Sequence, residues 1–354
     1  MLQPKLSSWL GALNSVQLHR LAVLLGTPCS GTKAARVTGI QGVLPSLQSP
    51  PSNKKADSGG ILHRNLSIVS LDMGIRNLAY AHLTASAKGD QNAGSFIEYG
   101  TPTLQSWRRI SIPGAASQMA EENSSYSKDE SDDSAMSSAP SASSKSTLTK
   151  ESFEPRDYAV YAYDFVKQII THHSPTHVLI ERQRFRSGGN SAVQEWTIRV
   201  GVFEGMLYAA LKTLIEETKA HIVVEPVLPA RVNRYWLDKT DATAQPVQAK
   251  STGKAVKKAK IDLVGRLLRE ADTRQGRMVV SDGVKPVADG LLSKLAKKKG
   301  TRGKSENSEI TKLDDLSDCL LQGLAWIDWS NNRSRLENAW PRDISLSVPF
   351  DLRC

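Results

Sequence analysis

Residues 66–73 read LSIVSLDM, an apolar run rich in β-branched residues that predicts a buried strand with one aspartate near its end. Residues 77–84, NLAYAHLT, and 105–112, QSWRRISI, predict two more strands, and short strands are predicted at 177–181, HVLIE, and 220–224, AHIVV. Four helices are predicted from apolar residues at helical spacing, over residues 157–171, 193–217, 254–271 and 314–328. Strands first, then alternating helices and strands, predict an α/β fold with a mixed sheet flanked by helices.

The chain is basic, and its charge is unevenly spread. Lys and Arg number 46 against 36 Asp and Glu, a formal net charge of +10. Residues 250–304 hold 16 basic and 5 acidic residues, a local excess of 11. Such an excess favours a polyanionic partner such as nucleic acid, or an acidic membrane surface. No apolar run approaches the roughly 18 residues that a membrane span needs.

Composition also divides the chain and excludes some classes of protein. The three cysteines, Cys29, Cys319 and Cys354, lie far apart, which excludes a disulfide scaffold and a cysteine zinc site. Serine supplies 13 of the 40 residues in 111–150, a composition typical of disorder. The predicted organisation is a helical unit at 1–44, a linker at 45–64, a core at 65–335 with a disordered insertion at 111–152 and a basic insertion at 240–310, and a tail at 336–354.

Acidic residues stand at ends of predicted elements, where their carboxylates can meet. Asp72 lies near the end of the first strand, and Glu181 ends the strand at 177–181. Asp314, Asp315 and Asp318 begin the last helix, where 314 and 318, or 315 and 318, share a face. Converging carboxylates repel one another, and Mg²⁺ or Mn²⁺ would relieve that repulsion. Two such ions can activate water for phosphodiester hydrolysis.

Each acid also has a structural explanation of its own. Asp72 could be a turn residue before Gly74, and Glu181 could pair with Arg182 or Arg184. The three helix acids could be there only because a helix N-terminus favours negative charge. Taken one by one, these explanations do not predict the order of strand aspartate, strand glutamate and helix aspartates.

Several longer segments are similar to the fungal mitochondrial Holliday junction resolvases, which belong to the ribonuclease H-like superfamily. They are residues 70–80, SLDMGIRNLAY, residues 180–186, IERQRFR, residues 228–236, LPARVNRYW, and residues 314–324, DDLSDCLLQGL. The resemblance covers roughly residues 66–84, 156–236 and 311–330. It implies a ribonuclease H-like core and a homodimer in the mitochondrial matrix that cuts four-way DNA junctions by paired, symmetric nicks.

The resemblance also implies a site. Asp72, Glu181, Asp315 and Asp318 would be the catalytic acids, holding Mg²⁺ or Mn²⁺, two ions per site. Asp72 would bridge both ions and Glu181 would hold one, while Asp318 with either Asp314 or Asp315 would hold the other. The products would carry a 5′-phosphate and a 3′-hydroxyl. Neither a membrane nor a small-molecule substrate is expected. The alternatives are another ribonuclease H-like nuclease that cuts flaps or RNA–DNA hybrids, and a non-catalytic junction-binding protein.

Basic residues beside the acids are candidates for DNA contacts. Three arginines and Phe185 follow Glu181 directly, ahead of a glycine pair, which suits a loop that grips phosphates and stacks on a base. The other interpretation places Phe185 in the core and the arginines in solvent. Arg76 either contacts a phosphate or neutralises a carboxylate. The full set of candidates is Arg76, Arg182, Gln183, Arg184, Phe185, Arg186, Lys33, Arg231 and Arg234.

The first 44 residues predict a small helical unit. Ser15 can cap a helix that Gly26 ends, and Lys33 falls in the first turn of a second helix. The pattern looks like a SAP motif, a helix-extended-helix DNA-binding unit, with Lys33 beside a helix N-terminus that can bind phosphate. Residues 1–56 contain no Asp or Glu, which is also typical of a mitochondrial targeting signal. The leucines expected on the buried side of the first helix are Leu18, Leu21, Leu24 and Leu25.

Overall fold

The computed structural model describes residues 6–44, 65–75, 77–88, 97–111, 154–183, 195–238, 253–297 and 313–339. Within these residues, six strands form one mixed sheet in the order β5-β4-β1-β2-β3-β6. The sheet is antiparallel between β1, β2 and β3, and parallel between β1 and β4, β4 and β5, and β3 and β6. The strands are β1 (Asn65–Asp72), β2 (Leu78–Ser86), β3 (Thr103–Ile110), β4 (His177–Glu181), β5 (Val223–Val227) and β6 (Val279–Val280). The predicted α/β class is confirmed.

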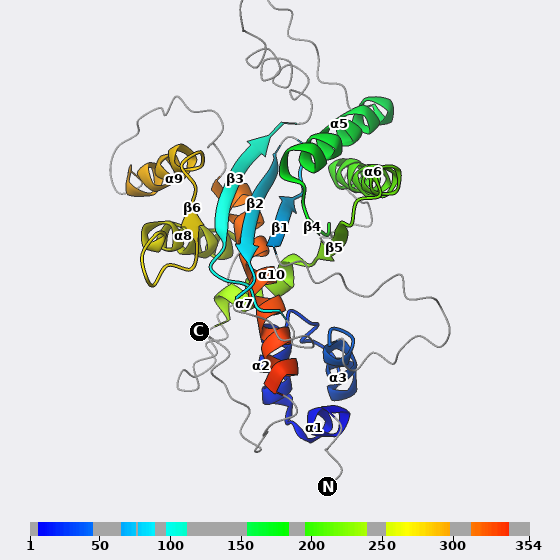
Figure 1. Cartoon of the computed structure of the whole chain (residues 1–354), viewed down its shortest axis with the longest axis vertical. Helices are drawn as coiled ribbons and strands as arrows, with labels where there is room; N and C mark the ends of the chain where they lie inside the picture. Colours follow the sequence, from blue (N-terminus) through cyan, green and yellow to red (C-terminus); the bar gives the residue numbers. More distant parts are fainter. Residues whose placement is uncertain are drawn as a thin grey trace, which may run out of the picture.

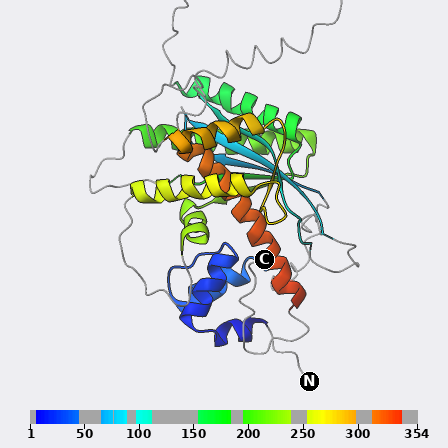
Figure 2. The ribbon, with the colours of Figure 1, turned by 90° about the vertical axis from the view of Figure 1, so that its left-hand side faces the viewer.

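Helices cover both faces of this sheet, as Figures 1 and 2 show. One face carries α5 (Pro155–His173) and α6 (Glu195–Thr218), which share an apolar core with β1 and β4. A second core lies on the other face. The helices of that face are α7 (Pro229–Leu237), α8 (Gly253–Glu270), α9 (Lys285–Lys297) and α10 (Leu313–Ala339). No helix in the described ranges is long and apolar enough to cross a membrane.

The structure describes the middle of the basic segment predicted at 240–310. Its described part, residues 253–297, forms α8, β6 and α9. These elements bury Val264, Leu267 and Leu291 in the core against α10. Residues 253–297 are therefore a structural layer of the core, with most of their lysines on the exposed sides of amphipathic helices and Lys260 buried. The serine-rich stretch at 111–152 lies outside the described residues, apart from Ser111.

The helical unit at the N-terminus contains α1 (Leu6–Ala12), α2 (Ser15–Leu24) and α3 (Lys33–Gln41). The prediction that Ser15 caps the first long helix is wrong by one residue. Asn14 caps it, because its Oδ1 accepts the amide hydrogens of Val16 and Gln17, and Gln17 bonds back to the Asn14 amide. The four predicted leucines of this helix are buried, and Lys33 is the first residue of α3.

Side chains of the core hold the C-terminal end of α2. Arg333 on α10 bonds the carbonyl of Leu25 through Nε at 3.0 Å and through a terminal nitrogen at 2.8 Å. Asn332 bonds the carbonyl of Leu24 at 2.9 Å. Gly26, at φ +69°, leaves room for the ring of Trp329, which a Cβ would overlap at 2.3 Å. The unit therefore packs on α10, which continues past its predicted end at residue 328 to provide these contacts.

Candidate active site

The sheet brings two of the predicted acids to the same edge and the same face. In β1, Leu66 and Ile68 face the core beneath α10, whereas Val69 and Leu71 face α5 and α6. Asp72 continues the first series, because successive side chains of a strand alternate between faces. β4 lies parallel to β1, with Leu71 opposite Ile180. Glu181 therefore follows Ile180 on β4 as Asp72 follows Leu71 on β1, and both carboxylates emerge beneath α10.

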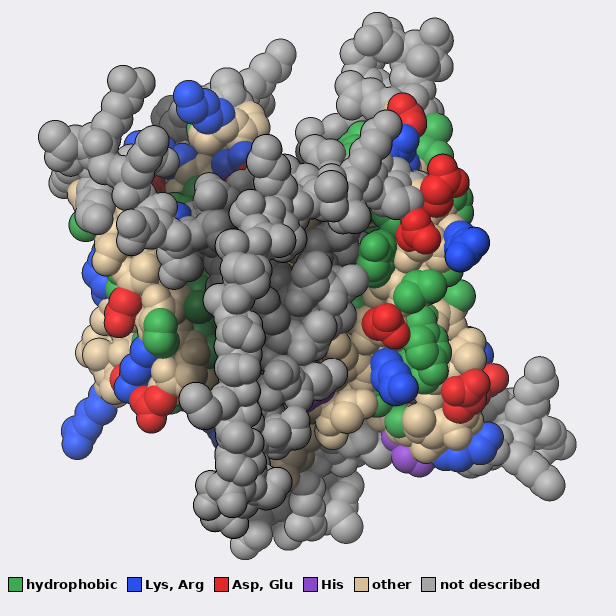
Figure 3. Space-filling model, turned by 90° about the horizontal axis from the view of Figure 1, so that it is seen from above, with side chains coloured by type: hydrophobic (Ala, Val, Ile, Leu, Met, Phe, Trp, Pro, Cys, Tyr) green, Lys and Arg blue, Asp and Glu red, His purple; other side chains and the backbone are tan. Residues whose placement is uncertain are grey.

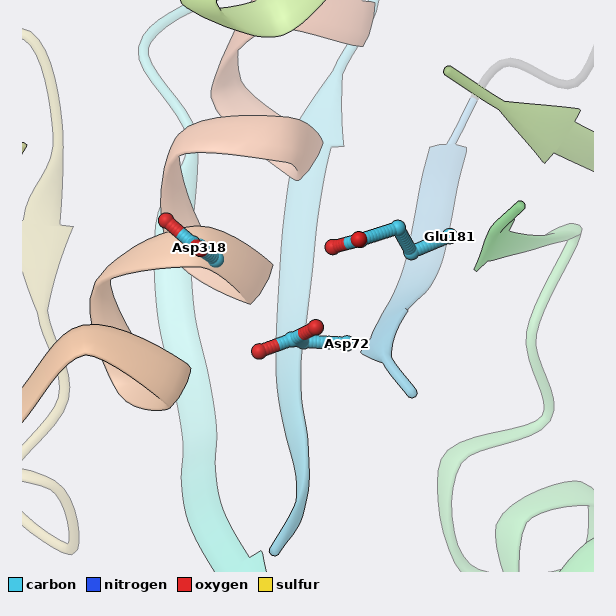
Figure 4. A group of neighbouring side chains, drawn as sticks. All are labelled: Asp72, Glu181 and Asp318. Carbon is cyan, nitrogen blue, oxygen red and sulfur yellow. The ribbon is translucent and has the colours of Figure 1, made fainter. Parts of the chain in front are cut away.

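Asp318, in the second turn of α10, completes the cluster. One carboxylate oxygen from each of Asp72, Glu181 and Asp318 lies within 4.8 Å of the others. Figure 4 shows the three side chains pointing toward one another from the two strands and the helix. The indole of Trp107 on β3 donates to the carbonyl of Leu316 at 2.9 Å, which ties the start of α10 to the sheet. Each acid stays partly exposed, so an ion or a phosphate can reach it.

The surrounding protein makes negative charge costly here. Burial raises the pKa of Glu181 to about 7, with the Asp318 charge adding to the effect and Lys260 opposing it. Burial also raises the pKa of Asp72 well above the usual carboxyl range, and the neighbouring Glu181 charge raises it further. The pKa of Asp318 is raised by burial, against the effect of Lys260. Without a cation, the cluster therefore binds protons that isolated carboxylates would release.

Lysines from α8 approach the acids of α10. The ammonium of Lys260 lies 2.6 Å from Asp318 Oδ2 and also pairs with Oδ1. Lys257, one turn earlier, pairs with Asp314 at 2.6 Å. Asp315 instead faces Arg109 on β3, at 3.5 Å. Of the three helix acids, Asp318 is thus the one that joins Asp72 and Glu181.

Lys260 is the main site residue that the sequence analysis missed. It is only 7% exposed, although it lies in a segment whose many lysines suggest a solvated surface. A signal was present, because Lys260 falls on the apolar stripe that continues through Val264, Leu267 and Leu268. A lysine on the buried face of an amphipathic helix indicates a buried anionic partner.

The predicted DNA-binding residues are found in different surroundings. Arg182 is exposed beside Glu181, and the Gln183 side chain donates to the carbonyl of Met73 at 3.5 Å. Lys33 is exposed at the start of α3, in the N-terminal helical unit rather than in the sheet that carries Asp72 and Glu181. Arg76, Arg184, Phe185 and Arg186 lie outside the described residues.

Arg231 and Arg234, on α7, bond within the protein. Arg231 donates to the carbonyl of Gly26 at 3.2 Å, and Arg234 lies 2.8 Å from the sulfur of Cys29. Both arginines therefore help to hold the N-terminal helical unit against the core. Contact of either residue with DNA stays a prediction.

The donor set fits a hard divalent cation. Three carboxylates converge, with no sulfur or imidazole among the grouped ligands, and Mg²⁺ or Mn²⁺ prefers oxygen. Burial and the charges of the neighbouring acids raise the pKa of Asp72 and Glu181, even with Lys260 present. A divalent cation would supply further positive charge here. These residues could therefore hold a metal at a surface that a phosphate can reach.

Comparison with known proteins places this site in a family. Residues 68–336 match the family model described as mitochondrial resolvase Ydc2 / RNA splicing MRS1. The chain is 22% identical over 336 residues to the mitochondrial cruciform cutting endonuclease 1 of Saccharomyces cerevisiae, covering 90% of this chain and 82% of that protein. It is 25% identical over 192 residues to the Schizosaccharomyces pombe protein of the same name, covering 53% of this chain and 64% of that protein.

Two solved structures also align with the chain. The crystal structure of the yeast mitochondrial Holliday junction resolvase Ydc2 gives a TM-score of 0.48 at 18% identity, covering 92% of this chain and 97% of that one. Thermus thermophilus RuvC in complex with a Holliday junction gives 0.31 at 12% identity, covering 73% and 92%. The family match includes all three acids of the cluster and most of the chain. The protein therefore belongs to the mitochondrial resolvase Ydc2 / RNA splicing MRS1 family.

Proposed function

We propose that this protein is a metal-dependent endonuclease that resolves four-way DNA junctions by paired, symmetric nicks. The family description covers both resolvases and an RNA splicing protein, so membership alone does not choose between cutting and binding. The observation that favours cutting is the convergence of Asp72, Glu181 and Asp318 at a surface site. A protein that only bound nucleic acid would gain nothing from carboxylates that repel both one another and phosphate.

The choice of substrate rests on the relatives. Two proteins that share sequence with this chain are named cruciform cutting endonucleases, and a cruciform contains four-way junctions. The net charge of +10 supports a polyanionic partner. A nuclease that cuts flaps or RNA–DNA hybrids would use the same carboxylates and would differ only in the nucleic acid that it binds.

Asp72, Glu181 and Asp318 would hold Mg²⁺ or Mn²⁺, with two ions per site. When bound, these ions lower the pKa of water and stabilise the charge that develops on the phosphate oxygens. The Asp315 charge raises the pKa of Asp72 and Glu181, whereas the Asp314 charge raises that of Asp318. We propose Asp315 as the fourth acid because its charge acts on both strand acids. Lys260 favours the ionised form of Asp318, since its charge opposes the effect of burial.

The reaction would be hydrolysis of one phosphodiester bond in each of two opposed strands. The carboxylates orient a water molecule so that its oxygen attacks phosphorus opposite the leaving 3′ oxygen. The P–O bond to that 3′ oxygen breaks, and the leaving oxygen takes up a proton. The products are a 5′-phosphate and a 3′-hydroxyl, which a ligase can rejoin without further processing.

DNA would reach the acids along the basic surface on either side of them. Arg182 and Gln183 follow Glu181 directly. Arg76, Arg184, Phe185 and Arg186, which stand within five residues of Asp72 or Glu181 in the sequence, are also proposed to contact DNA. Lys33 would contact a phosphate at the N-terminus of α3, as in a SAP-like unit. Because α2 is fixed to α10, such a contact would lie at a constant distance from the acids.

Two symmetric nicks need two active sites, and an apolar surface on α5 and α6 suits a second copy of this chain. Val160 and Tyr163 on α5, and Ile198 and Val202 on α6, are each between 40% and 55% exposed. Figure 3 shows hydrophobic side chains gathered on the right-hand side, where α5 and α6 lie in Figure 1. We propose that this surface forms a homodimer, which would place one acid cluster on each side of a junction.

The mitochondrial matrix is the proposed location. Both relatives named above are described as mitochondrial. The absence of Asp and Glu from residues 1–56 is consistent with import. The negative interior of the matrix attracts basic, acid-free segments of this kind.

The experiment that tests the proposal compares substrates. Purified protein is incubated with an immobile four-way junction, the matching duplex, a flap and an RNA–DNA hybrid, each with Mg²⁺ and with EDTA. Paired nicks at symmetry-related positions, in the junction alone and only with Mg²⁺, are expected. Cutting of the hybrid or flap instead would keep the metal centre and overturn the substrate. Tight junction binding without cleavage in Mg²⁺ would favour the binding-only alternative.

A further inference from the structure

Gln322 lies one helical turn after Asp318 on α10, on the side that faces the sheet. Its side chain is 2% exposed, in a core that is otherwise largely apolar. The amide nitrogen lies 3.0 Å from Ser70 Oγ, 3.2 Å from the carbonyl oxygen of Leu71 and 3.5 Å from that of Leu179. One buried amide thus reaches two adjacent strands.

These two strands carry the other two acids of the cluster. Leu71 directly precedes Asp72 on β1, and Leu179 stands two residues before Glu181 on β4. Gln322 therefore bonds β1 at the residue before Asp72 and β4 two residues before Glu181. A shift of α10 along or away from the sheet would change the separation of Asp318 from both acids, and it would also break these bonds.

The helix comes very close to the sheet at the next residue. A Cβ on Gly323 would lie 2.6 Å from a methyl carbon of Leu83 and 3.3 Å from the Cβ of Ser70. A larger residue at this position would require the Leu83 side chain to move and would tighten the contact with Ser70. The close approach also lets the Gln322 side chain reach the strand carbonyls.

We propose that Gln322, with Gly323 beside it, is a positioning residue that sets the distance of Asp318 from Asp72 and Glu181. This inference rests on the proposed function, since it assumes that these three acids bind metal. The affinity of a site for a divalent cation depends strongly on the positions of its oxygen ligands. Removing a group that orients the metal ligands without touching the metal lowers metal affinity or activity by about 10- to 100-fold.

The test measures Mn²⁺ binding by calorimetry, in the absence of DNA. Gln322→Leu preserves the size of the side chain and removes its hydrogen bonds. It is expected to weaken Mn²⁺ binding by about 10- to 100-fold. Its affinity for a four-way junction in EDTA should equal that of the wild type, because the proposed DNA contacts lie elsewhere. Junction cleavage at saturating DNA should fall in kcat while KM stays unchanged.

A matched control is available on the same helix. Asn331 is also a buried amide of α10, and it bonds the backbone nitrogen and oxygen of Tyr99 at 2.7 and 3.0 Å. It stands 13 residues after Asp318, about 20 Å along the helix axis. Asn331→Leu should lower thermal stability at least as much as Gln322→Leu does, with unchanged Mn²⁺ affinity.

Two milder variants keep the inference testable if Gln322→Leu does not fold. Ser70→Ala removes only the nearest partner of the amide, and Gly323→Ala separates helix and sheet while leaving every polar group in place. Both should weaken Mn²⁺ binding in the same direction. Wild-type affinity in all folded variants at these positions, or an equal loss in Asn331→Leu, would overturn the inference. A wild-type protein that binds no Mn²⁺ would instead overturn the proposed function on which it rests.

Discussion

Glu181→Gln should stabilise the metal-free protein at alkaline pH, although it removes a proposed metal ligand. Burial raises the pKa of Glu181 from 4.5 to about 7. The folded state therefore holds a proton between these values that the unfolded chain releases. The contribution of Glu181 to stability is therefore greatest below pH 4.5, and it declines as the pH rises toward 7. The raised pKa of Asp72 and Asp318 acts in the same direction.

The size of the effect follows from the pKa difference. A pKa raised from 4.5 to about 7 corresponds to about 3 kcal/mol of unfolding free energy at pH 8. Glutamine has the shape of the protonated acid and cannot ionise, so the variant should retain that amount. With bound metal, the wild type should instead be more stable than Glu181→Gln. At a concentration 100 times its dissociation constant, a ligand adds about 2.7 kcal/mol to the protein that binds it.

Urea unfolding at a series of pH values, with EDTA and with Mg²⁺, measures this effect. In EDTA the variant and the wild type should agree near pH 4.5, and the variant should be more stable at pH 8. Glu217→Gln, which replaces an exposed glutamate near the end of α6, serves as the control and should follow the wild type. A variant that is no more stable than the wild type at pH 8 in EDTA would refute the argument that crowded, buried charge destabilises this site.

Three further predictions concern other parts of the molecule. The rings of His82 and His173 lie 4.4 Å apart, and burial lowers the pKa of each to about 4. The contribution of these two histidines to stability should therefore fall as the pH drops from 6.5 to 4. In urea unfolding, His173→Gln should reduce that fall, and an unchanged dependence of stability on pH would contradict the assignment. Asp315→Asn should slow junction cleavage more than Asp314→Asn does, and the reverse order of rates would favour Asp314 as the fourth acid. Ile198→Glu should shift the protein from dimer to monomer in sedimentation, whereas an exposed position on α2, changed as Val16→Glu, should leave the dimer intact.

Local sequence patterns predict the sheet well and the long-range contacts poorly. The strand at 177–181 has the predicted bounds, because a short apolar run between turns allows only one assignment. β5 begins three residues later than predicted, and α7 and α9 were not predicted as helices. The last helix was predicted to end at residue 328. It continues to Ala339, and Asn332 and Arg333 in this last part bond the carbonyls at the end of α2. Both residues are polar, so the apolar spacing that predicts a buried helix does not extend to them.

The acid cluster could be predicted, and its cationic partner could not. Asp72 and Glu181 each interrupt an apolar strand, and that local signal marks a site. Choosing among Asp314, Asp315 and Asp318 requires knowing which residue of α10 faces the sheet edge. Lys260 is separated from Asp318 by 58 residues, and only the packing of α8 against α10 brings the two together.

The central claim is that Asp72, Glu181 and Asp318 form the centre that cuts DNA. Single-turnover cleavage of a four-way junction with Mg²⁺, by the wild type and by Asp318→Asn, tests it most directly. The protein concentration should saturate the junction, and Asp262→Asn on the exposed side of α8 serves as the control. Loss of one preorganised charged group from a catalytic centre costs about 10²–10³ in rate. The account predicts a loss of at least that size with junction binding retained. Cleavage by Asp318→Asn at the wild-type rate would contradict it.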